Sequence, residues 1–184
     1  MPGYPFATAL PFIPDEAHRP VFLLSGLAEH TKNLLDDPKA SLLVTDPGHA
    51  NVLESPRMTL VGDVQRFDAS PEMRARYVRY LPEAAQYLEL GDFAFFRLTP
   101  ARTRYIGGFA QMGWLEQDAW DEAQVLRLDE EAALLRDLAA GHTHILGIDC
   151  YGIDLARAGR RERIAFDNAR TPQEIPAEVS RLLV

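Results

Sequence analysis

The chain has 184 residues, of which 47% are hydrophobic and 25% are charged, as is usual for a soluble globular protein. Its formal net charge of −8 argues against binding to nucleic acid or to an anionic membrane surface, since both favour basic proteins. Its single cysteine, Cys150, excludes an internal disulfide, and neither a signal peptide nor a long apolar run is visible. These features predict a cytoplasmic protein with one large domain and room for a small appendage.

The N-terminal part of the chain predicts three strands and one helix. Strands are expected at Tyr4–Phe12, Val21–Leu24 and Ala40–Thr45, where apolar residues alternate or run together. A helix is expected at Leu27–Leu35, because Ser25 precedes it and serine is typical of a helix N-cap.

The middle of the chain predicts further strands around a second helical region. The expected elements are a strand at 57–67, a helical region that begins at Ser70, and strands at 92–99 and 102–109. Gly62 lies inside the first of these strands and indicates a bulge or a close backbone approach. Pro100 is expected to separate the last two strands, because proline has no N–H for a strand ladder.

A change in composition places a domain boundary near residue 116. Asp118–Ala140 is acidic and mostly helical in pattern. Short strands are expected at 143–149, 153–155 and 163–166, before a last helix at 173–183. We therefore expect an N-terminal domain at 1–116 and a small α+β domain at 117–184. Strands followed by inserted helices favour an α+β fold, with a closed or split β-barrel ahead of this appendage.

One segment has the pattern of an anion site. Around Ser25 a predicted strand ends and a helix begins, and the first turn of a helix offers free N–H groups to an anion. Ser25, His30, Thr31 and Lys32 add hydroxyl and cationic donors, and together they suit a phosphate. The alternative interpretation is an ordinary capped helix with polar residues on its surface.

Two further segments suit a flat or charged ligand. Arg57 begins a predicted strand, where it either meets solvent or contacts a phosphate or a polar ring edge. Arg104–Phe109 places aromatic residues beside Gly107 and Gly108, and glycines let the backbone approach a flat ligand closely. The alternative for this segment is a strand that simply ends in a turn.

The remaining candidate residues predict no catalytic group and no metal site. His142 and His144 lie on one face of an expected strand, but no third ligand follows at a suitable spacing, so both are interpreted as exposed histidines. Cys150 is interpreted as a small buried hydrophobic residue rather than a nucleophile.

The order of several blocks resembles the pyridoxamine 5′-phosphate oxidase-like flavoproteins, and within them the haem-utilisation, haem oxygenase-like branch. The blocks are Ser25–Leu34, Asp37–Val44, Pro56–Gly62, Tyr80–Pro82, Gly91–Phe93 and Tyr105–Phe109. They extend through residues 4–115. Gly147–Asp149 and Gly152–Leu155 resemble a shortened form of the small α+β domain that often follows this barrel.

The resemblance implies a six-stranded split β-barrel of the FMN-binding type. It also implies a homodimer that binds FMN at its interface, with both subunits contributing to each site, and a small-molecule substrate. By position, Ser25, His30, Thr31 and Lys32 would lie near the FMN phosphate, with His30 where the oxidases carry a lysine. Arg57 replaces a glutamine near the flavin, and Tyr105 replaces a tryptophan against it.

Three departures from the family pattern change the expected function. A helix and a first strand that usually precede the Tyr4 strand are missing, which indicates a misassigned start codon or an incomplete barrel. Gln111 and Gly113 stand where the oxidases carry arginine and histidine for the substrate phosphate, so pyridoxamine phosphate oxidase activity is not expected. The tail lacks the Met-Asn-x-Asp-His stretch of full-length relatives, which puts a haem role of that domain in doubt.

Three functions therefore compete. The first is a flavin-dependent oxidoreductase, in which FMN carries out the electron transfer and the protein supplies binding and orientation. The second is a haem-binding or haem-degrading protein on the same barrel, with His30, His142 or His144 as the iron ligand. The third is a non-catalytic, truncated dimer without a cofactor.

Overall fold

The computed structural model of the chain describes residues 4–46, 51, 55–108, 111–138 and 144–183. The chain divides into two compact units, each of which we describe by itself. The first unit spans Met1–Pro14, Arg19–Asp68 and Leu90–Ala123, and the second spans Asp15–His18, Ala69–Glu89 and Gln124–Val184. These units interleave along the chain, while a division into independent domains near residue 116 stays a prediction.

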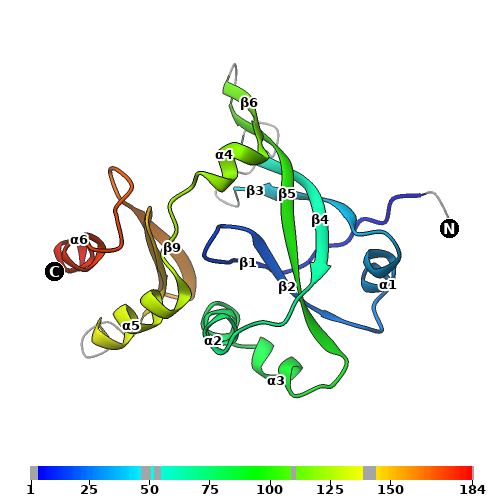
Figure 1. The fold of residues 1–184 in the computed structure, drawn as a ribbon, viewed down its shortest axis with the longest axis horizontal. Coiled ribbons are helices and arrows are strands. Elements are labelled where there is room, and N and C mark those ends of the chain that lie inside the picture. Colours follow the sequence, from blue (N-terminus) through cyan, green and yellow to red (C-terminus); the bar gives the residue numbers. More distant parts are fainter. Residues whose placement is uncertain (1–3, 47–50, 52–54, 109–110, 139–143, 184) are drawn as a thin grey trace. The chain divides into compact units, whose positions relative to one another are not determined.

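The first unit is built on a six-stranded antiparallel sheet with the order β1-β2-β5-β4-β3, in which β6 also pairs with β5 (Figure 1). The strands are β1 (Ile13–Pro14), β2 (Pro20–Ser25), β3 (Lys39–Thr45), β4 (Arg57–Arg66), β5 (Phe93–Gly108) and β6 (Gln111–Glu116). The long strand β5 pairs with β2 near its start and with β6 near its end, while β4 follows its other edge. β5 thus connects the two ends of the sheet.

β5 is one continuous strand, so the predicted break at Pro100 is wrong. Pro100 lies opposite Gly62, where the β4–β5 register shifts between Val61 and Gly62. This irregularity accepts a residue without an N–H donor, which is why proline does not end the strand here. The prediction for Gly62 is confirmed, because a Cβ atom on this residue would collide with the carbonyl of Thr99.

Two other predictions about strands need correction. Residues 4–12 are not a strand, and only Ile13–Pro14 pairs with β2, although Leu10 and Phe12 pack against the core of the unit. An alternating sequence becomes a strand only where a neighbouring backbone completes its hydrogen bonds. Conversely, β6 was not predicted from the sequence, because all of its residues are exposed and its apolar residues do not alternate.

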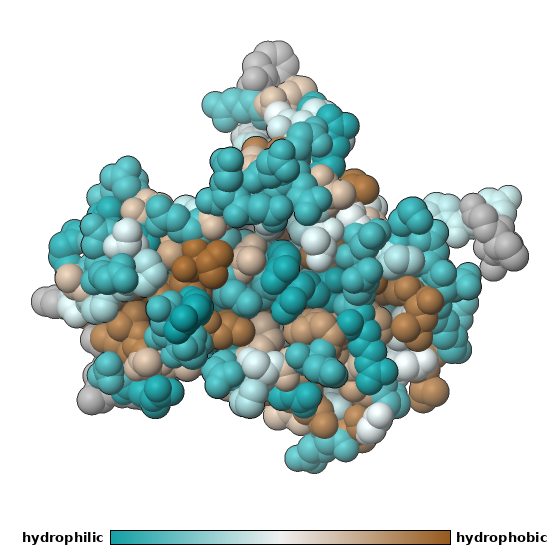
Figure 2. Space-filling model, viewed as in Figure 1, coloured by the Kyte–Doolittle hydropathy of each residue, from teal (hydrophilic) through white to brown (hydrophobic). Residues whose placement is uncertain are grey.

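The core of the first unit lies on one face of the sheet. Its buried members are Phe22, Leu24, Leu60, Val64, Phe96 and Leu98. Helix α1 (Glu29–Asp36) contributes Leu34 to this core, and α4 (Gln117–Asp121) contributes Trp120. Hydrophobic residues also reach the surface where Figure 1 draws α1 (Figure 2). Leu35 in α1 is 65% exposed, and Leu27, which precedes the helix, is 76% exposed.

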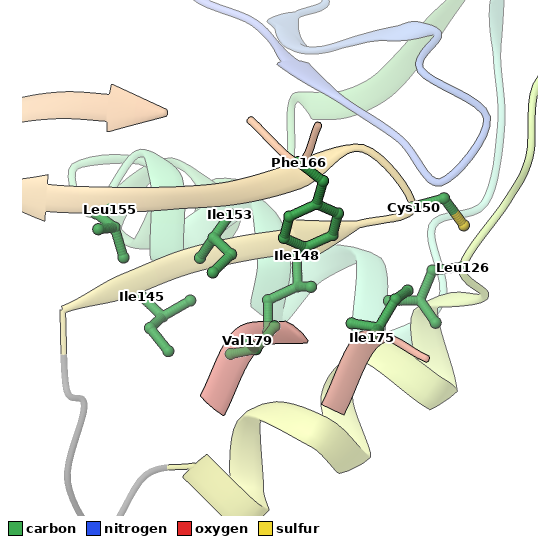
Figure 3. Packing of buried hydrophobic residues seen from close by; sticks show 9 residues of the cluster. All are labelled: Leu126, Ile145, Ile148, Cys150, Ile153, Leu155, Phe166, Ile175 and Val179. Atoms are coloured by element: carbon green, nitrogen blue, oxygen red, sulfur yellow. The ribbon is translucent and has the colours of Figure 1, made fainter. Parts of the chain in front are cut away.

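The second unit combines a three-stranded antiparallel sheet with four helices. Its elements are α2 (Pro71–Tyr80), α3 (Ala84–Leu88), α5 (Leu128–Leu138), β7 (Ile145–Asp149), β8 (Gly152–Arg157), β9 (Arg160–Ala165) and α6 (Ile175–Leu182). Ser70 caps α2, as its Oγ accepts a hydrogen bond from Met73 N at 3.2 Å. Ile145, Ile148, Ile153, Ile175 and Val179 form much of a core between the sheet and helices α5 and α6 (Figure 3).

Candidate functional site

The segment between β2 and α1 is fixed to the start of β5 by hydrogen bonds. Ser25 Oγ accepts a hydrogen bond from Leu27 N at 3.1 Å and donates one to Asp92 Oδ2 at 2.5 Å. Gly26 N donates to the Asp92 carbonyl at 2.7 Å. Asp92 therefore holds the turn that leads into the helix.

Ser25 is not the N-cap of α1, which corrects the prediction from the sequence. The helix begins at Glu29, so its N-cap is Ala28. Ala28 makes no side-chain capping hydrogen bond. The first turn of a helix carries N–H groups without intrahelical partners and a partial positive charge. Thr31 N already donates to the Ala28 carbonyl at 3.1 Å, so the N–H groups of Glu29 and His30 are the ones left for an anion.

Thr31 is the most unusual residue of this segment. It is only 1% exposed, and its Oγ1 has no hydrogen-bond partner among the described residues. A buried hydroxyl without a partner costs about 1–3 kcal/mol, so such a group is normally paired. Its position in the first turn of α1 places an unused donor beside the free helix N–H groups.

Thr31 lines a small cavity of about 90 Å³. The lining residues are Leu24, Gly26, Thr31, Leu35, Arg66, Gly91, Asp92, Phe93, Ala94 and Phe96. A cavity of this volume has room for a few waters or for one group of phosphate size. Arg66, at the end of β4, adds a cation, while Asp92 already accepts a hydrogen bond from Ser25.

The cavity brings together only part of the predicted site. Thr31 lines it, and Ser25 is joined to its wall through Asp92. His30 is half-buried and Lys32 is exposed in the same helix, but neither lines the cavity. Arg66 and Asp92 were missed as site residues, although the register of β2, β4 and β5 brings their strand ends together.

Arg57 and Tyr105 lie at the other end of the sheet. Arg57 is opposite Ile106 in the β4–β5 register, so Arg57 and Tyr105 occupy neighbouring positions but opposite faces. Ser25 is opposite Phe93, and Tyr105 follows Phe93 by 12 residues. At about 3.3 Å per residue, this separation amounts to roughly 40 Å along β5.

The glycines after Tyr105 accommodate a ring of the chain itself. A Cβ atom on Gly107 would lie 2.7 Å from Oη and 2.8 Å from Cε1 of Tyr105. The tyrosine ring, which is 43% exposed, therefore packs over Gly107. A flat ligand at this end would meet the ring of Tyr105 rather than bare backbone.

The other candidate residues show no reactive arrangement. Cys150 is fully buried, and burial raises the pKa of its thiol, so the reactive thiolate is disfavoured. His142 lies outside the described residues, and the backbone carbonyl of His144 accepts a hydrogen bond from Ala156 N. No group of three or more metal-ligating side chains occurs in the described part of the chain. None of the described helices is long and apolar enough to cross a membrane.

The second unit contains a buried ion network. Arg76 and Glu131 form an ion pair with side chains that are both 3% exposed, and Arg79 Nη2 lies 3.3 Å from the same carboxylate oxygen. Glu131 Oε1 also accepts a hydrogen bond from Ile148 N at 2.9 Å. This network joins α2 to α5 and β7 within the second unit.

The first unit is an antiparallel split barrel with a small cavity at a strand–helix junction. Residues 2–107 match the protein family described as pyridoxamine 5′-phosphate oxidase. The chain belongs to this family, and the resemblance noted from the sequence blocks and the α+β split-barrel fold are both confirmed.

Individual relatives add detail. The chain is 37% identical over 111 residues to the chloroplast heme oxygenase HOZ of Arabidopsis thaliana, a match that covers 59% of this chain and 33% of HOZ. The chain thus spans about a third of the length of this relative.

Two solved structures resemble the whole chain in fold. A protein of unknown function from Agrobacterium tumefaciens has a TM-score of 0.74 and 24% identity, over 98% of this chain and 84% of the other. A heme binding protein from Mycobacterium smegmatis has a TM-score of 0.62 and 23% identity, over 98% and 86% of the two chains.

Proposed function

We propose that this protein binds FMN and acts as a flavin-dependent oxidoreductase on a small molecule. The observation that carries the proposal is the unpartnered Oγ1 of Thr31, buried in a phosphate-sized cavity at the uncapped start of α1. A phosphate accepts hydrogen bonds from a hydroxyl and from helix N–H groups, and it pairs with an arginine.

The residues of the cavity fit the phosphate end of FMN. Thr31 Oγ1 and the N–H groups of Glu29 and His30 would donate to the phosphate oxygens, and Arg66 would balance their charge. Bound FMN supplies hydride or electron transfer, for which the protein provides binding and orientation. Gln111 and Gly113 lie on β6 without the basic side chains that a phosphorylated pyridoxine substrate would need, which supports a different substrate.

We propose further that each site is completed by a second copy of the chain. The path along β5 from Phe93, which lines the α1 cavity, to Tyr105 is roughly 40 Å and longer than FMN, which favours a site to which two subunits contribute. In a two-fold dimer, the Arg57 and Tyr105 end of one subunit meets the α1 cavity of the other.

The outer face of the sheet supports the dimer. Leu43, Thr59, Arg104 and Trp114 form one cross-strand row from β3 to β6, beside exposed Val61 and Met112. Two guanidinium groups contact the ring of Trp114, with Arg102 at 4.1 Å and Arg104 at 5.2 Å from its centroid. Aromatic residues, methionine and arginine are the residue types enriched in protein interfaces.

The test of the FMN site uses Thr31→Val, with Thr31→Ser as the matched control. Loss of one hydrogen bond to a charged group costs about 1.5–3 kcal/mol, so the valine variant should bind FMN about 10- to 100-fold more weakly. The serine variant keeps the hydroxyl and should bind as the wild type does. Equal FMN affinity in all three proteins, measured by fluorescence quenching, would refute the assignment.

The test of the two-subunit site mixes two inactive variants. Thr31→Val and Arg57→Ala should each lose flavin when purified alone. After unfolding together and refolding, a mixed dimer contains one site with both native residues, so about a quarter of all sites should regain flavin. If the refolded mixture binds no more flavin than the separate variants do, the two-subunit site is wrong. Either both residues then belong to a site within one subunit, or neither belongs to the site.

Haem is the second candidate, because the Arabidopsis relative with 37% identity is named a heme oxygenase. A haem propionate is negatively charged, as a phosphate is, and suits the same cavity. No histidine lines the cavity, so an iron ligand would come from elsewhere; His30, half-buried in α1, is the nearest in sequence to Thr31. Titration with haemin distinguishes the candidates, since a Soret shift that displaces FMN favours haem.

A further inference from the structure

The turn between β8 and β9 has a backbone that its sequence does not favour. Ala158 and Gly159 form this two-residue turn, and both have positive φ angles, 49° and 75°. Turns of this kind favour glycine or asparagine, because a Cβ atom disfavours the left-handed region. Ala158 therefore makes the hairpin less stable than glycine or asparagine would in its place.

Four arginines gather around this turn in a chain whose net charge is −8. The inner two are used within the second unit. Arg161 Nη2 donates to the Tyr80 carbonyl at 2.7 Å. Arg163 donates to Asp149 at 2.7 Å and to Asp154 at 2.9 Å. These two side chains share one face of the hairpin, and their role is structural.

The outer two arginines, Arg157 and Arg160, have no comparable structural role. They are direct cross-strand partners on either side of the turn, so their side chains start from the same face. Arg157 is half exposed and has one ion-pair contact, with Glu162 at 3.6 Å. Arg160 is exposed, and its side chain makes no hydrogen bond or ion pair with any described residue. Like charges directly opposite each other destabilise a strand pair.

We infer that the tip of the β8–β9 hairpin is a binding site for a phosphate group, held between Arg157 and Arg160. Two cationic side chains with Cβ atoms about 5 Å apart can approach one anion from both sides, and the planar guanidinium matches phosphate oxygens in pairs. A bound phosphate also removes the repulsion between the two arginines. The site lies in the second unit and is distinct from the α1 cavity of the first.

The direct test measures binding of inorganic pyrophosphate to the full chain by isothermal titration calorimetry. The double variant Arg157→Gln/Arg160→Gln is compared with Arg127→Gln/Arg181→Gln, whose arginines are 67% and 60% exposed and ion-paired in the same unit. Both variants lose the same charge and keep the α1 cavity. We expect at least a tenfold loss of affinity for the hairpin site in the first variant and none in the second.

If both variants bind pyrophosphate as tightly as the wild type, the inference is wrong. It is also wrong if both lose affinity to the same extent, because that indicates a general charge effect. Ala158→Gly serves as a second probe that does not depend on removing charge. It should raise the unfolding temperature and keep the affinity, because both arginines remain. Arg157→Lys/Arg160→Lys keeps the charge and should bind more weakly than the wild type, because lysine lacks the paired donors.

The phosphate is either part of a small soluble compound or part of a lipid headgroup. Vesicles of phosphatidylcholine, with and without phosphatidic acid, separate these sources in a sedimentation assay. Sedimentation that needs phosphatidic acid and is lost in Arg157→Gln/Arg160→Gln identifies the headgroup. Pyrophosphate binding without sedimentation identifies a soluble phosphate, and binding to neither probe refutes the site.

Discussion

Replacing Glu131 with alanine should strongly destabilise the second unit. Glu131 is 2% exposed, and its carboxylate faces Arg76, which is 3% exposed, as well as Arg79 and Ile148 N. The variant leaves a buried arginine without its charge partner, and breaking such a pair costs about 3–5 kcal/mol. For a chain of this size each kcal/mol shifts the unfolding temperature by about 2–4 °C, so a decrease of about 6–20 °C is expected.

Circular dichroism during urea unfolding provides the assay, with Asp137→Ala as the matched control. Asp137 lies in the same helix, is exposed, and its replacement makes the same change in charge. The double variant Arg76→Met/Glu131→Met removes both partners and should recover much of the loss, since buried ion pairs are often replaced by apolar residues without cost. A loss below about 1 kcal/mol for Glu131→Ala would refute the reasoning, because that is the range of an exposed pair.

Three further changes test the packing and the pKa shifts. Gly62→Ala forces a Cβ atom onto the carbonyl of Thr99 and should cost more than about 2 kcal/mol in urea unfolding. Gly147→Ala places a Cβ atom against the ring and hydroxyl of Tyr80 and should displace α2, which near-ultraviolet circular dichroism would detect as a changed tyrosine signal. Burial raises the pKa of both Cys150 and Tyr80, so these groups ionise earlier in the unfolded chain; stability should therefore fall as the pH rises above about 9, measured as a falling urea midpoint.

The outcomes that contradict these predictions are equally specific. Gly113→Ala is the control for the glycine variants, because its added Cβ atom meets no atom within 4 Å. If it destabilises as much as Gly62→Ala, collision with the Thr99 carbonyl is not the cause of the loss, since Gly→Ala without a collision should be neutral or stabilising. A urea midpoint that stays constant or rises between pH 8 and pH 10.5 would contradict the raised pKa values.

The positions of β2, β3 and β4 along the chain are visible in the sequence, because their apolar residues alternate or run together. The exceptions have physical causes. Pro100 is accepted within β5 because the register shifts opposite it, and this depends on a partner strand that a linear pattern does not reveal. β6 carries exposed apolar residues on both faces and so gives no alternating signal.

The candidate site was predicted in part. The strand–helix junction at Ser25 has a local signature, and Thr31 was among the residues that it indicated. The burial of Thr31, its unpartnered hydroxyl, and the approach of Arg66 and Asp92 depend on how β4 and β5 pair with β2, so they emerge only from the structure. For the same reason, the sequence did not reveal how far Arg57 and Tyr105 lie from Ser25 along β5.

The central claim is that Thr31 and the start of α1 hold the phosphate of a bound flavin. The most direct measurement is the visible absorption spectrum of the protein after incubation with FMN and gel filtration, for the wild type beside Thr31→Val. We predict that the wild-type peak retains the two absorption bands of a flavin and that the valine variant elutes colourless. A wild-type peak without flavin, or a valine variant that retains as much flavin as the wild type, would contradict the account.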